Sequence, residues 1–227
     1  MPDSAKKIIA TYDAVGGPAQ PSMGNDGHMK SPTRQGEFVV ASCGKHTSTR
    51  YPYWSKVPWG TPLRKERGRL EVSMNGRWRS LSEYTSADEL AITIRNSQLY
   101  GRFELPDKWI FNDFGHMTCY YFKDVNKNRK LDKNESLQGD FIHTTPDNES
   151  ETKKSEDVIL VESHGCIHVK PNDIDDMIKK GYLKKGNKIY VHGYSDPVPT
   201  DTGSTGRAPY ELHFYPGPHK LIVQGGR

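Results

Sequence analysis

A short stretch of the sequence places one cysteine between two histidines. Cys166 has His164 two positions before it and His168 two positions after it. A cysteine attacks as its thiolate, and a nearby imidazole can remove the thiol proton or hold the ion pair that results. A third imidazole, His143, ends an earlier strand-like run. The pattern indicates a nucleophilic cysteine, and its alternative is a buried thiol beside a surface histidine.

The residue before the thiol adds a second chemical element. Gly165 allows a tight turn, and backbone amides beside a nucleophile in such a turn can point at a developing oxyanion. The other two cysteines, Cys43 and Cys119, are far from Cys166 and from each other, and no C-x-x-C pair occurs. An odd, widely spaced set opposes both a disulfide framework and a structural zinc site. We therefore interpret Cys43 and Cys119 as unpaired structural thiols.

Short strands must position these side chains. The Asn75-Gly76 pair, flanked by alternating residues, is a strong signal for a hairpin with a type I′ turn. Two short helices are expected, one after Ser86 and one after Pro171-Asn172. The fold class is therefore mainly β, a sandwich or open barrel with two short helices. The expected strands cover 8–12, 37–42, 70–74, 77–81, 109–111, 118–122, 140–144, 158–162 and 188–192.

Composition limits the classes of protein. The 227 residues are 33% hydrophobic and carry a net charge of only +4, so we expect one folded domain with a thin core and long polar loops. Basic residues are scattered among acidic ones, which argues against nucleic acid as a partner. The longest apolar runs, such as 158–161, are too short to span a membrane. After residue 195 the composition predicts a linker and a C-terminal tail over 196–227.

The stretch Ser163-His164-Gly165-Cys166-Ile167 resembles the signature of the L,D-transpeptidase (YkuD-like) family, in which a histidine precedes a Ser/Thr-His-Gly-Cys block. His143 matches that upstream histidine. Residues 31–38 resemble the family's Thr-Pro-x-Gly-x-Phe strand entry, with two extra residues before the glycine. The resemblance covers about residues 8–194 and implies a catalytic domain over 1–195.

The resemblance implies a peptidoglycan-modifying cysteine acyltransferase that needs no cofactor for its chemistry. In that family the cysteine attacks the carbonyl of the third, diamino-acid residue of a stem peptide and releases the terminal D-amino acid. The acyl group then passes to an amine, which forms a cross-link, or to water, which is L,D-carboxypeptidase activity. The expected substrates are therefore peptidoglycan stem peptides.

The resemblance also implies roles for individual residues. Cys166 is the expected nucleophile and His143 the base that activates it and then protonates the leaving amine. The N–H groups of Gly165 and Cys166 are the expected oxyanion donors. Ser163 and His164 are expected to shape the turn and tune the thiol. The carbonyl of Thr144 is expected to select the tautomer of His143.

Three features depart from the family pattern. His168 stands where the family usually has Arg or Asn, so it either contacts the substrate carboxylate or supports the site from behind. The spacer between His143 and Ser163 has 19 residues, which is longer than expected and predicts an enlarged loop. The stretch 101–140 contains an insertion.

That insertion holds a possible calcium loop at 124–135. Its spacing resembles the EF-hand pattern, with Leu131 at the usual apolar position and Arg129 where a glycine normally allows the sharp turn. The alternative is a solvated, charged hairpin. A bound ion would be structural and would pin the loop that leads to His143. The expected ligands are Asp124, Asn126, Asn128, the carbonyl of Lys130, Asp132 and Glu135.

Competing functions remain at this stage. One is a calcium-stabilised, catalytically inactive cell-wall-binding module, and a less favoured one is a cysteine peptidase that acts on ordinary proteins. The N-terminus shows no secretory leader. We therefore expect a protein of the periplasm or cell wall that is exported by another route or expressed without its leader. A secreted antibacterial effector is one form of this prediction, with secretion machinery or an immunity protein as further partners.

Overall fold

The computed structural model describes residues 7–24, 27–46, 54–200 and 206–226 of the chain. The chain forms two compact units, so the single domain expected over 1–195 is divided. The barrel unit comprises Met1–Gly44, Met117–Thr144 and Val158–Arg227, and the inserted unit comprises Lys45–His116 and Thr145–Asp157. The division arises because the inserted segment buries a hydrophobic core of its own.

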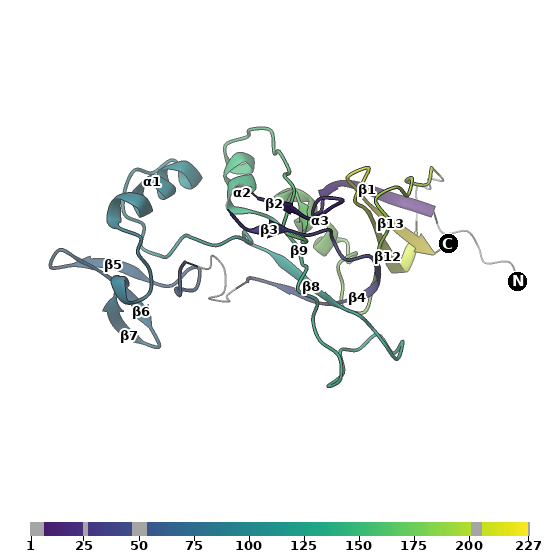
Figure 1. The fold of residues 1–227 in the computed structure, drawn as a ribbon, viewed down its shortest axis with the longest axis horizontal. Coiled ribbons are helices and arrows are strands. Elements are labelled where there is room, and N and C mark those ends of the chain that lie inside the picture. Colours follow the sequence, from purple (N-terminus) through teal and green to yellow (C-terminus); the bar gives the residue numbers. More distant parts are fainter. Residues whose placement is uncertain (1–6, 25–26, 47–53, 201–205, 227) are drawn as a thin grey trace, which may run out of the picture. The chain divides into compact units, whose positions relative to one another are not determined.

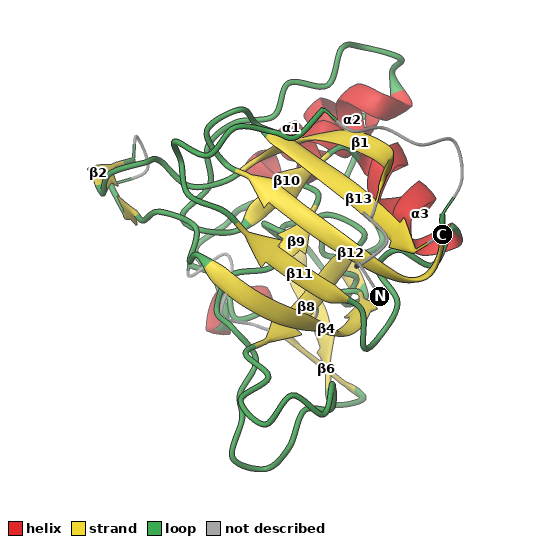
Figure 2. Ribbon diagram, turned by 90° about the vertical axis from the view of Figure 1, so that its right-hand side faces the viewer, coloured by secondary structure: helices red, strands yellow, loops and turns green. Residues whose placement is uncertain are grey.

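Eight strands of the barrel unit close into a barrel, in the order β1-β10-β9-β8-β4-β11-β12-β13 (Figure 2). Neighbouring strands are antiparallel, except that β9 is parallel to β10 and β11 is parallel to β12. Closure pairs each strand on both sides. The mainly β prediction is confirmed, and the barrel is closed, not open. The strands are β1 (Lys7–Val15), β4 (Gly36–Gly44), β8 (Thr118–Phe122), β9 (Ile142–His143), β10 (Ile167–Val169), β11 (Lys188–Val191), β12 (Arg207–Tyr215) and β13 (Lys220–Gly226).

Every strand of the barrel contributes apolar side chains to one core. The helix α3 (Pro171–Lys179) adds Ile174 and Met177, which are fully buried. This helix begins near the predicted position with proline in its first turn, and its apolar residues recur at helical spacing. A small separate sheet pairs β2 (Ser22–Met23) with β3 (Met29–Lys30) (Figure 1).

The prediction of a C-terminal tail is wrong. Strands β12 and β13 lie within 196–227 and complete the barrel between β11 and β1. Alternate residues of β12, Leu212 and Phe214, point into the core, as do Leu221 and Val223 of β13. The proline-rich and tyrosine-rich composition hid this alternation, although it is the usual pattern of a half-buried strand.

Two of the expected strands are absent from the described residues. Residues 109–111 and 158–162 form no strand, and only 142–143 of the run 140–144 is paired. The apolar run near 160 is instead exposed, since Ile159 and Val161 keep 68% and 60% of their surface. An apolar run forms a β-strand only if a neighbouring strand pairs with it. Sequence periodicity alone does not show whether such a partner is present.

The inserted unit combines a three-stranded sheet with two helices. The predicted hairpin is confirmed, because Asn75 and Gly76 both have positive φ, as a type I′ turn requires. The expected first helix begins after its N-cap, Asp88, which accepts a hydrogen bond from the N–H of Ala91. A further helix, α2, was not predicted because its sequence is almost wholly polar. The elements are β5 (Leu63–Glu66), β6 (Arg69–Met74), β7 (Arg77–Ser80), the 3-10 helix η1 (Leu81–Glu83), α1 (Glu89–Tyr100) and α2 (Pro146–Lys153).

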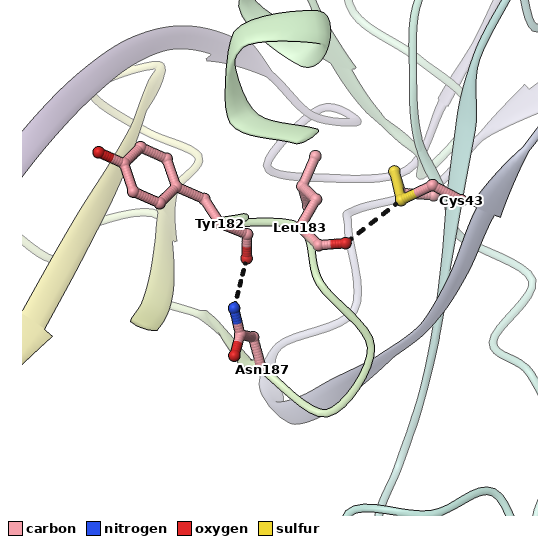
Figure 3. The surroundings of a disulfide bond; sticks show 5 residues. Cys43, Tyr182, Leu183 and Asn187 are labelled. Carbon is pink, nitrogen blue, oxygen red and sulfur yellow. Dashed lines mark hydrogen bonds between the residues drawn. A yellow bond between two sulfur atoms is a disulfide. The ribbon is translucent and has the colours of Figure 1, made fainter. Parts of the chain in front are cut away.

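Cys43 and Cys119 form a disulfide bond, so the prediction of unpaired thiols is wrong. The two residues lie directly opposite each other on the antiparallel strands β4 and β8. Their sequence separation of 76 residues gave no sign of this pairing. The carbonyl of Leu183 lies near Cys43 (Figure 3). Asn187 Nδ2 donates to the carbonyl of Tyr182 at 2.9 Å. The disulfide leaves Cys166 as the free cysteine of the chain.

No helix among the described residues combines the length and apolar character needed to cross a membrane.

Candidate active site

The pairing of β9 with β10 places Cys166 and His143 on the same face. Ile142 pairs with Ile167 and His143 pairs with His168, and both isoleucines are fully buried in the core. Because side chains alternate along a strand, the residues on either side of the isoleucines face away from that core. Cys166 immediately precedes Ile167 and therefore lies diagonally across from His143.

The thiol turn, residues 163–166, is held by the side chain of Ser163. Its Oγ donates to the carbonyl of Cys166 at 2.5 Å and accepts from the N–H of Gly165 at 3.0 Å. Gly165 has a φ of +132°, which L side chains rarely adopt. The expected shaping role of Ser163 therefore has a geometric basis. The N–H of Gly165 is directed at Ser163, which opposes its expected use as an oxyanion donor, whereas the N–H of Cys166 takes no part in these bonds.

A buried glycine pair supports the thiol turn from the N-terminal part of the chain. Ser163 N–H donates to the carbonyl of Gly16 at 3.0 Å. A methyl group on Gly17 would lie 1.9 Å from the carbonyl oxygen of Ser31 and 3.2 Å from the nitrogen of Gly165. Thr33 Oγ1 also accepts from Gly17 N–H at 2.9 Å. The segment 31–38, identified by its sequence pattern, thus lies beside the thiol turn.

The tautomer of His143 follows from one hydrogen bond. His143 is buried, and its Nδ1 lies 2.6 Å from the carbonyl oxygen of Thr144. Since a carbonyl only accepts, Nδ1 carries the proton and the basic lone pair is on Nε2. The contact expected of Thr144 is therefore present in the structure.

His168 packs against His143. The two rings meet edge to face with centroids 4.7 Å apart, and His168 Nδ1 lies 2.9 Å from the carbonyl oxygen of Val161. His168 is only 8% exposed, and burial lowers its pKa. A buried, neutral ring is poorly suited to hold a substrate carboxylate. This geometry favours the alternative in which His168 supports the site from behind.

The remaining histidine of the motif is on the surface. His164 is exposed, and its ring lies edge to face with His28 at a centroid distance of 6.5 Å. Nearby, Lys30 forms an ion pair with Glu162 at 3.8 Å. The two histidines that flank Cys166 in the sequence therefore differ, since His168 faces His143 and His164 faces outward.

The electrostatic surroundings of Cys166 favour the neutral thiol. The pKa of Cys166 is raised to about 12 in total: burial raises it most, the N–H of Phe141 lowers it by donating to Sγ at 3.4 Å, and the charge of Asp140 raises it. A thiol in this setting reacts when a base removes its proton. Sequence reasoning missed Asp140, because this residue precedes β9 and is brought beside the thiol turn by tertiary contacts.

The loop at residues 124–135, which we call the acidic loop for its three carboxylates although four basic residues accompany them, gathers most of its predicted ligands through hydrogen bonds. Asn126 Nδ2 and Asn128 Nδ2 each donate to Asp132 Oδ2 at 2.7 Å, and these bonds lower the pKa of Asp132. Glu135 accepts from backbone N–H groups at both ends of the loop. Asp124 accepts from the N–H groups of residues 128 and 129.

The loop's donor set is incomplete as a metal site in this arrangement. Lys130 enters the network through its N–H, which donates to Asn128 Oδ1 at 2.8 Å. Within the described residues, no group of three or more His, Cys, Asp or Glu side chains is arranged to hold a metal ion. Both asparagine side chains point their amide nitrogen toward Asp132. A rotation of each amide by 180° would place its oxygen there instead, as a metal ligand requires.

A family model for the YkuD L,D-transpeptidase catalytic domain matches residues 5–191, which is most of the chain. No curated protein and no solved structure is significantly similar to the chain. The match includes the thiol turn, His143 and the strands that position them. The chain therefore belongs to the YkuD family of L,D-transpeptidase catalytic domains, whose members modify peptidoglycan.

Proposed function

We propose that Cys166 is the nucleophile of a peptidoglycan acyltransferase, with His143 as its general base. The supporting observation is that both side chains lie on the same face of the β9/β10 pair, while the contact with Thr144 leaves the basic nitrogen of His143 on Nε2. The electrophile is the carbonyl carbon of the third, diamino-acid residue of a stem peptide. The leaving group is the terminal D-amino acid.

Each proton has a defined route in this mechanism. His143 Nε2 takes the Sγ proton as sulfur attacks the carbonyl carbon, and it returns that proton to the leaving amine as the peptide bond breaks. Because burial raises the pKa of Cys166, proton removal accompanies the attack and does not precede it. The N–H of Cys166 is the proposed oxyanion donor, since that of Gly165 is directed at Ser163.

The thioester is then resolved by an amine or by water. Attack by an amine forms a new amide bond and frees the thiol, which is transpeptidation. Attack by water gives a carboxylic acid, which is carboxypeptidase activity. In each case His143 accepts a proton from the attacking group and returns it to the sulfur.

Mass spectrometry of muropeptides after incubation with the purified protein tests this function. New links between two diamino acids would identify a transpeptidase, and shortened tripeptide stems would identify a carboxypeptidase. Intact-protein mass spectrometry with a carbapenem-like acylating agent separates an enzyme from a wall-binding module, because a module would not acylate. Unchanged muropeptides together with an unlabelled thiol would contradict the proposal.

We further propose that the acidic loop binds calcium as a structural ion. Support comes from its EF-hand-like spacing and from the hydrogen bonds that bring Asp132, Asn126 and Asn128 together. Thermal unfolding in calcium and in chelator, with magnesium as the control cation, tests this role. A rise in melting temperature specific to calcium is expected, and equal melting temperatures would contradict it.

The proposed site of action is the periplasm or cell wall. Besides the family's substrate, the disulfide between Cys43 and Cys119 supports an oxidising compartment. The role of secreted antibacterial effector, with an immunity protein as partner, stays a prediction from the sequence. Expression of the protein in the periplasm of a test bacterium, beside Cys166→Ala, tests this role: an effector should lyse the cells in a thiol-dependent way, and unimpaired growth would contradict it.

A further inference from the structure

One half-buried carboxylate lies beside the thiol turn and has no part in the mechanism above. Asp140 Oδ1 would lie 2.9 Å from a methyl group built on Gly165, so the carboxylate covers the turn where glycine leaves room. Its Oδ2 accepts a long hydrogen bond of 3.4 Å from the N–H of Arg34. Burial raises the pKa of Asp140, while Arg34 acts to lower it.

No basic side chain among the described residues forms an ion pair with Asp140. The nearest electrostatic partner is Arg34, whose guanidinium donates instead to Gln138 Oε1 at 2.6 Å. Buried carboxylates are normally paired, because leaving water costs free energy that a partner cation offsets. Asp140 therefore presents a negative charge that the folded chain itself does not neutralise by contact.

In the absence of substrate, the negative charge of Asp140 disfavours ionisation of the Cys166 thiol. A negative charge near Cys166 opposes formation of the thiolate and raises the pKa of the thiol. A positively charged group that bound to Asp140 would cancel this effect when substrate arrived. The geometry thus favours a cation that belongs to the substrate.

We propose that Asp140 is a specificity-determining residue that binds a primary ammonium group of the peptidoglycan stem peptide. The inference rests on the proposed function, because it assumes a stem peptide at Cys166. The ammonium group has two sources, the side chain of the diamino acid in the acyl donor and the amine of the acceptor, which binds in its protonated form and releases a proton to solvent before it attacks as the neutral amine. Both offer the same charge-assisted hydrogen bond to a carboxylate.

Two kinetic experiments separate these sources. The first measures the rate of thioester formation by intact-protein mass spectrometry, with tetrapeptide donors whose side-chain amine is free or acetylated. The second starts from the preformed thioester and measures partition between transfer and hydrolysis by water, with a diamino-acid acceptor whose amine is protonated and with a weakly basic amine acceptor that is neutral at the same pH. Asp140→Asn is the test variant, and Glu37→Gln is the control that removes one negative charge from an ion pair with Lys188 on the barrel.

In the donor case, the wild type should react about 10-fold to 100-fold faster with the free amine than with the acetylated donor. Asp140→Asn should reduce that preference to below about threefold, and it should react with the acetylated donor at least as fast as the wild type, because the charge that opposes thiolate formation is gone. In the acceptor case, the preference appears in the partition experiment, where Asp140→Asn shifts the products toward hydrolysis. Glu37→Gln should keep the wild-type preference in both.

Wild-type measurements alone can overturn the proposal, so it does not depend on the folding of a variant. If the wild type forms a thioester equally well with free and acetylated donors, and its partition is indifferent to the charge of the acceptor, Asp140 does not bind an ammonium group and the proposed function stands. If Asp140→Asn keeps the wild-type preference, the ammonium group binds elsewhere. If the wild type forms no thioester with any donor, the proposed function itself fails.

Discussion

The thiol turn and the acidic loop are both recognisable from residue spacing, yet the fold holds them in different ways. The thiol turn donates a hydrogen bond to Gly16 and lies beside Gly17 and Ser31, all more than 100 residues earlier in the chain. The acidic loop is closed by hydrogen bonds among its own residues, and most of its side chains are exposed. One motif is fixed by tertiary packing and the other by local contacts.

This difference indicates how each motif responds to change. In the thiol turn the shape is imposed by buried neighbours, so the chemistry of Cys166 can be removed without losing the fold. In the acidic loop the carboxylates and amides are themselves the support, so their removal affects local stability and leaves chemistry intact. Substitutions in the two regions should therefore separate activity from stability.

The largest expected effect is on activity. Cys166→Ala should lower acyl transfer by on the order of 10⁴-fold or more, because no other free thiol is present. Its free energy of unfolding should change by less than about 1 kcal/mol. Acyl transfer is measured by release of the terminal D-amino acid, and stability by urea unfolding.

Glu135→Gln is the matched change in the acidic loop. Glu135 accepts from the N–H groups of Val125 and Asp132, so its loss should cost about 1 kcal/mol of stability while transfer stays within about threefold of wild type. A loss of activity in Glu135→Gln as large as that in Cys166→Ala would break the distinction between the two regions.

The second effect is on the packing of the thiol turn. Gly17→Ala should destabilise the protein by about 3 kcal/mol, because its methyl group would lie 1.9 Å from the backbone oxygen of Ser31 and force backbone movement. The same movement should reduce activity, since the added methyl group would also lie 3.2 Å from the nitrogen of Gly165. Urea unfolding together with the acylation rate checks both expectations.

Gly139→Ala is the control for a glycine in open space. A methyl group there would meet no atom within 4 Å. This variant should unfold within about 0.5 kcal/mol of wild type. Equal destabilisation by both alanine substitutions would show that close packing does not explain the effect at Gly17.

The candidate site was predicted mainly through the resemblance of residues 163–167 and His143 to the family's motif. The parallel pairing of β9 with β10 brings thiol and imidazole to the same face, and only the structure gives that register. Asp140 could not be found in this way. Its place beside Gly165 depends on how separate segments pack, and no periodicity marks a residue just outside a strand.

The fold was predictable where apolar and polar residues alternate along a strand and where a glycine marks the turn, as at Asn75-Gly76. It was not predictable where pairing joins distant segments. The disulfide between Cys43 and Cys119 depends on the register of β4 and β8, and the last two strands depend on closure of the barrel. Helix α2 is polar and is stabilised by its cap at Thr145 and by contacts within the inserted unit, such as that of Asp147 with Arg95.

The third effect is the pH dependence of the free energy of unfolding. It differs between the two regions because His168 titrates beside the thiol turn and Asp132 titrates in the acidic loop. Burial lowers the pKa of His168, so the unfolded chain binds a proton near pH 6.5 while the folded protein does so only at lower pH. The stability that the neutral ring contributes is therefore complete above about pH 6.5 and is lost as the pH falls below it, by at most about 1.4 kcal/mol per pH unit.

His168→Gln should reduce the loss of unfolding free energy between pH 7 and pH 5, as measured by urea unfolding at each pH. The exposed His219 gives the control His219→Gln, which should keep the wild-type slope. In the acidic loop the pKa of Asp132 is lowered, so its contribution should be lost only as the pH falls below about 4. If His168→Gln leaves the slope of unfolding free energy against pH unchanged, His168 is not the group responsible for this pH dependence.

The smallest effect tests whether the acidic loop is governed by its own backbone. Arg129 has a φ of +59°, a conformation that costs a residue with a Cβ and suits glycine. Arg129→Gly should stabilise the protein by about 0.5 kcal/mol, since relief of this strain slightly exceeds the added entropy of the unfolded chain. It also restores glycine at the sixth position of the EF-hand pattern, so calcium should bind the variant more tightly.

Lys133→Gly is the matched control in the same loop. Lys133 is exposed and does not have a positive φ, so glycine relieves nothing there and should cost about 0.5 kcal/mol through the unfolded chain. Chemical unfolding in chelator measures the two stabilities, and calcium titration by calorimetry measures affinity. Opposite signs at positions 129 and 133 would show that local backbone conformation governs this loop. Equal signs would mean that contacts beyond the loop determine its shape, as they do for the thiol turn.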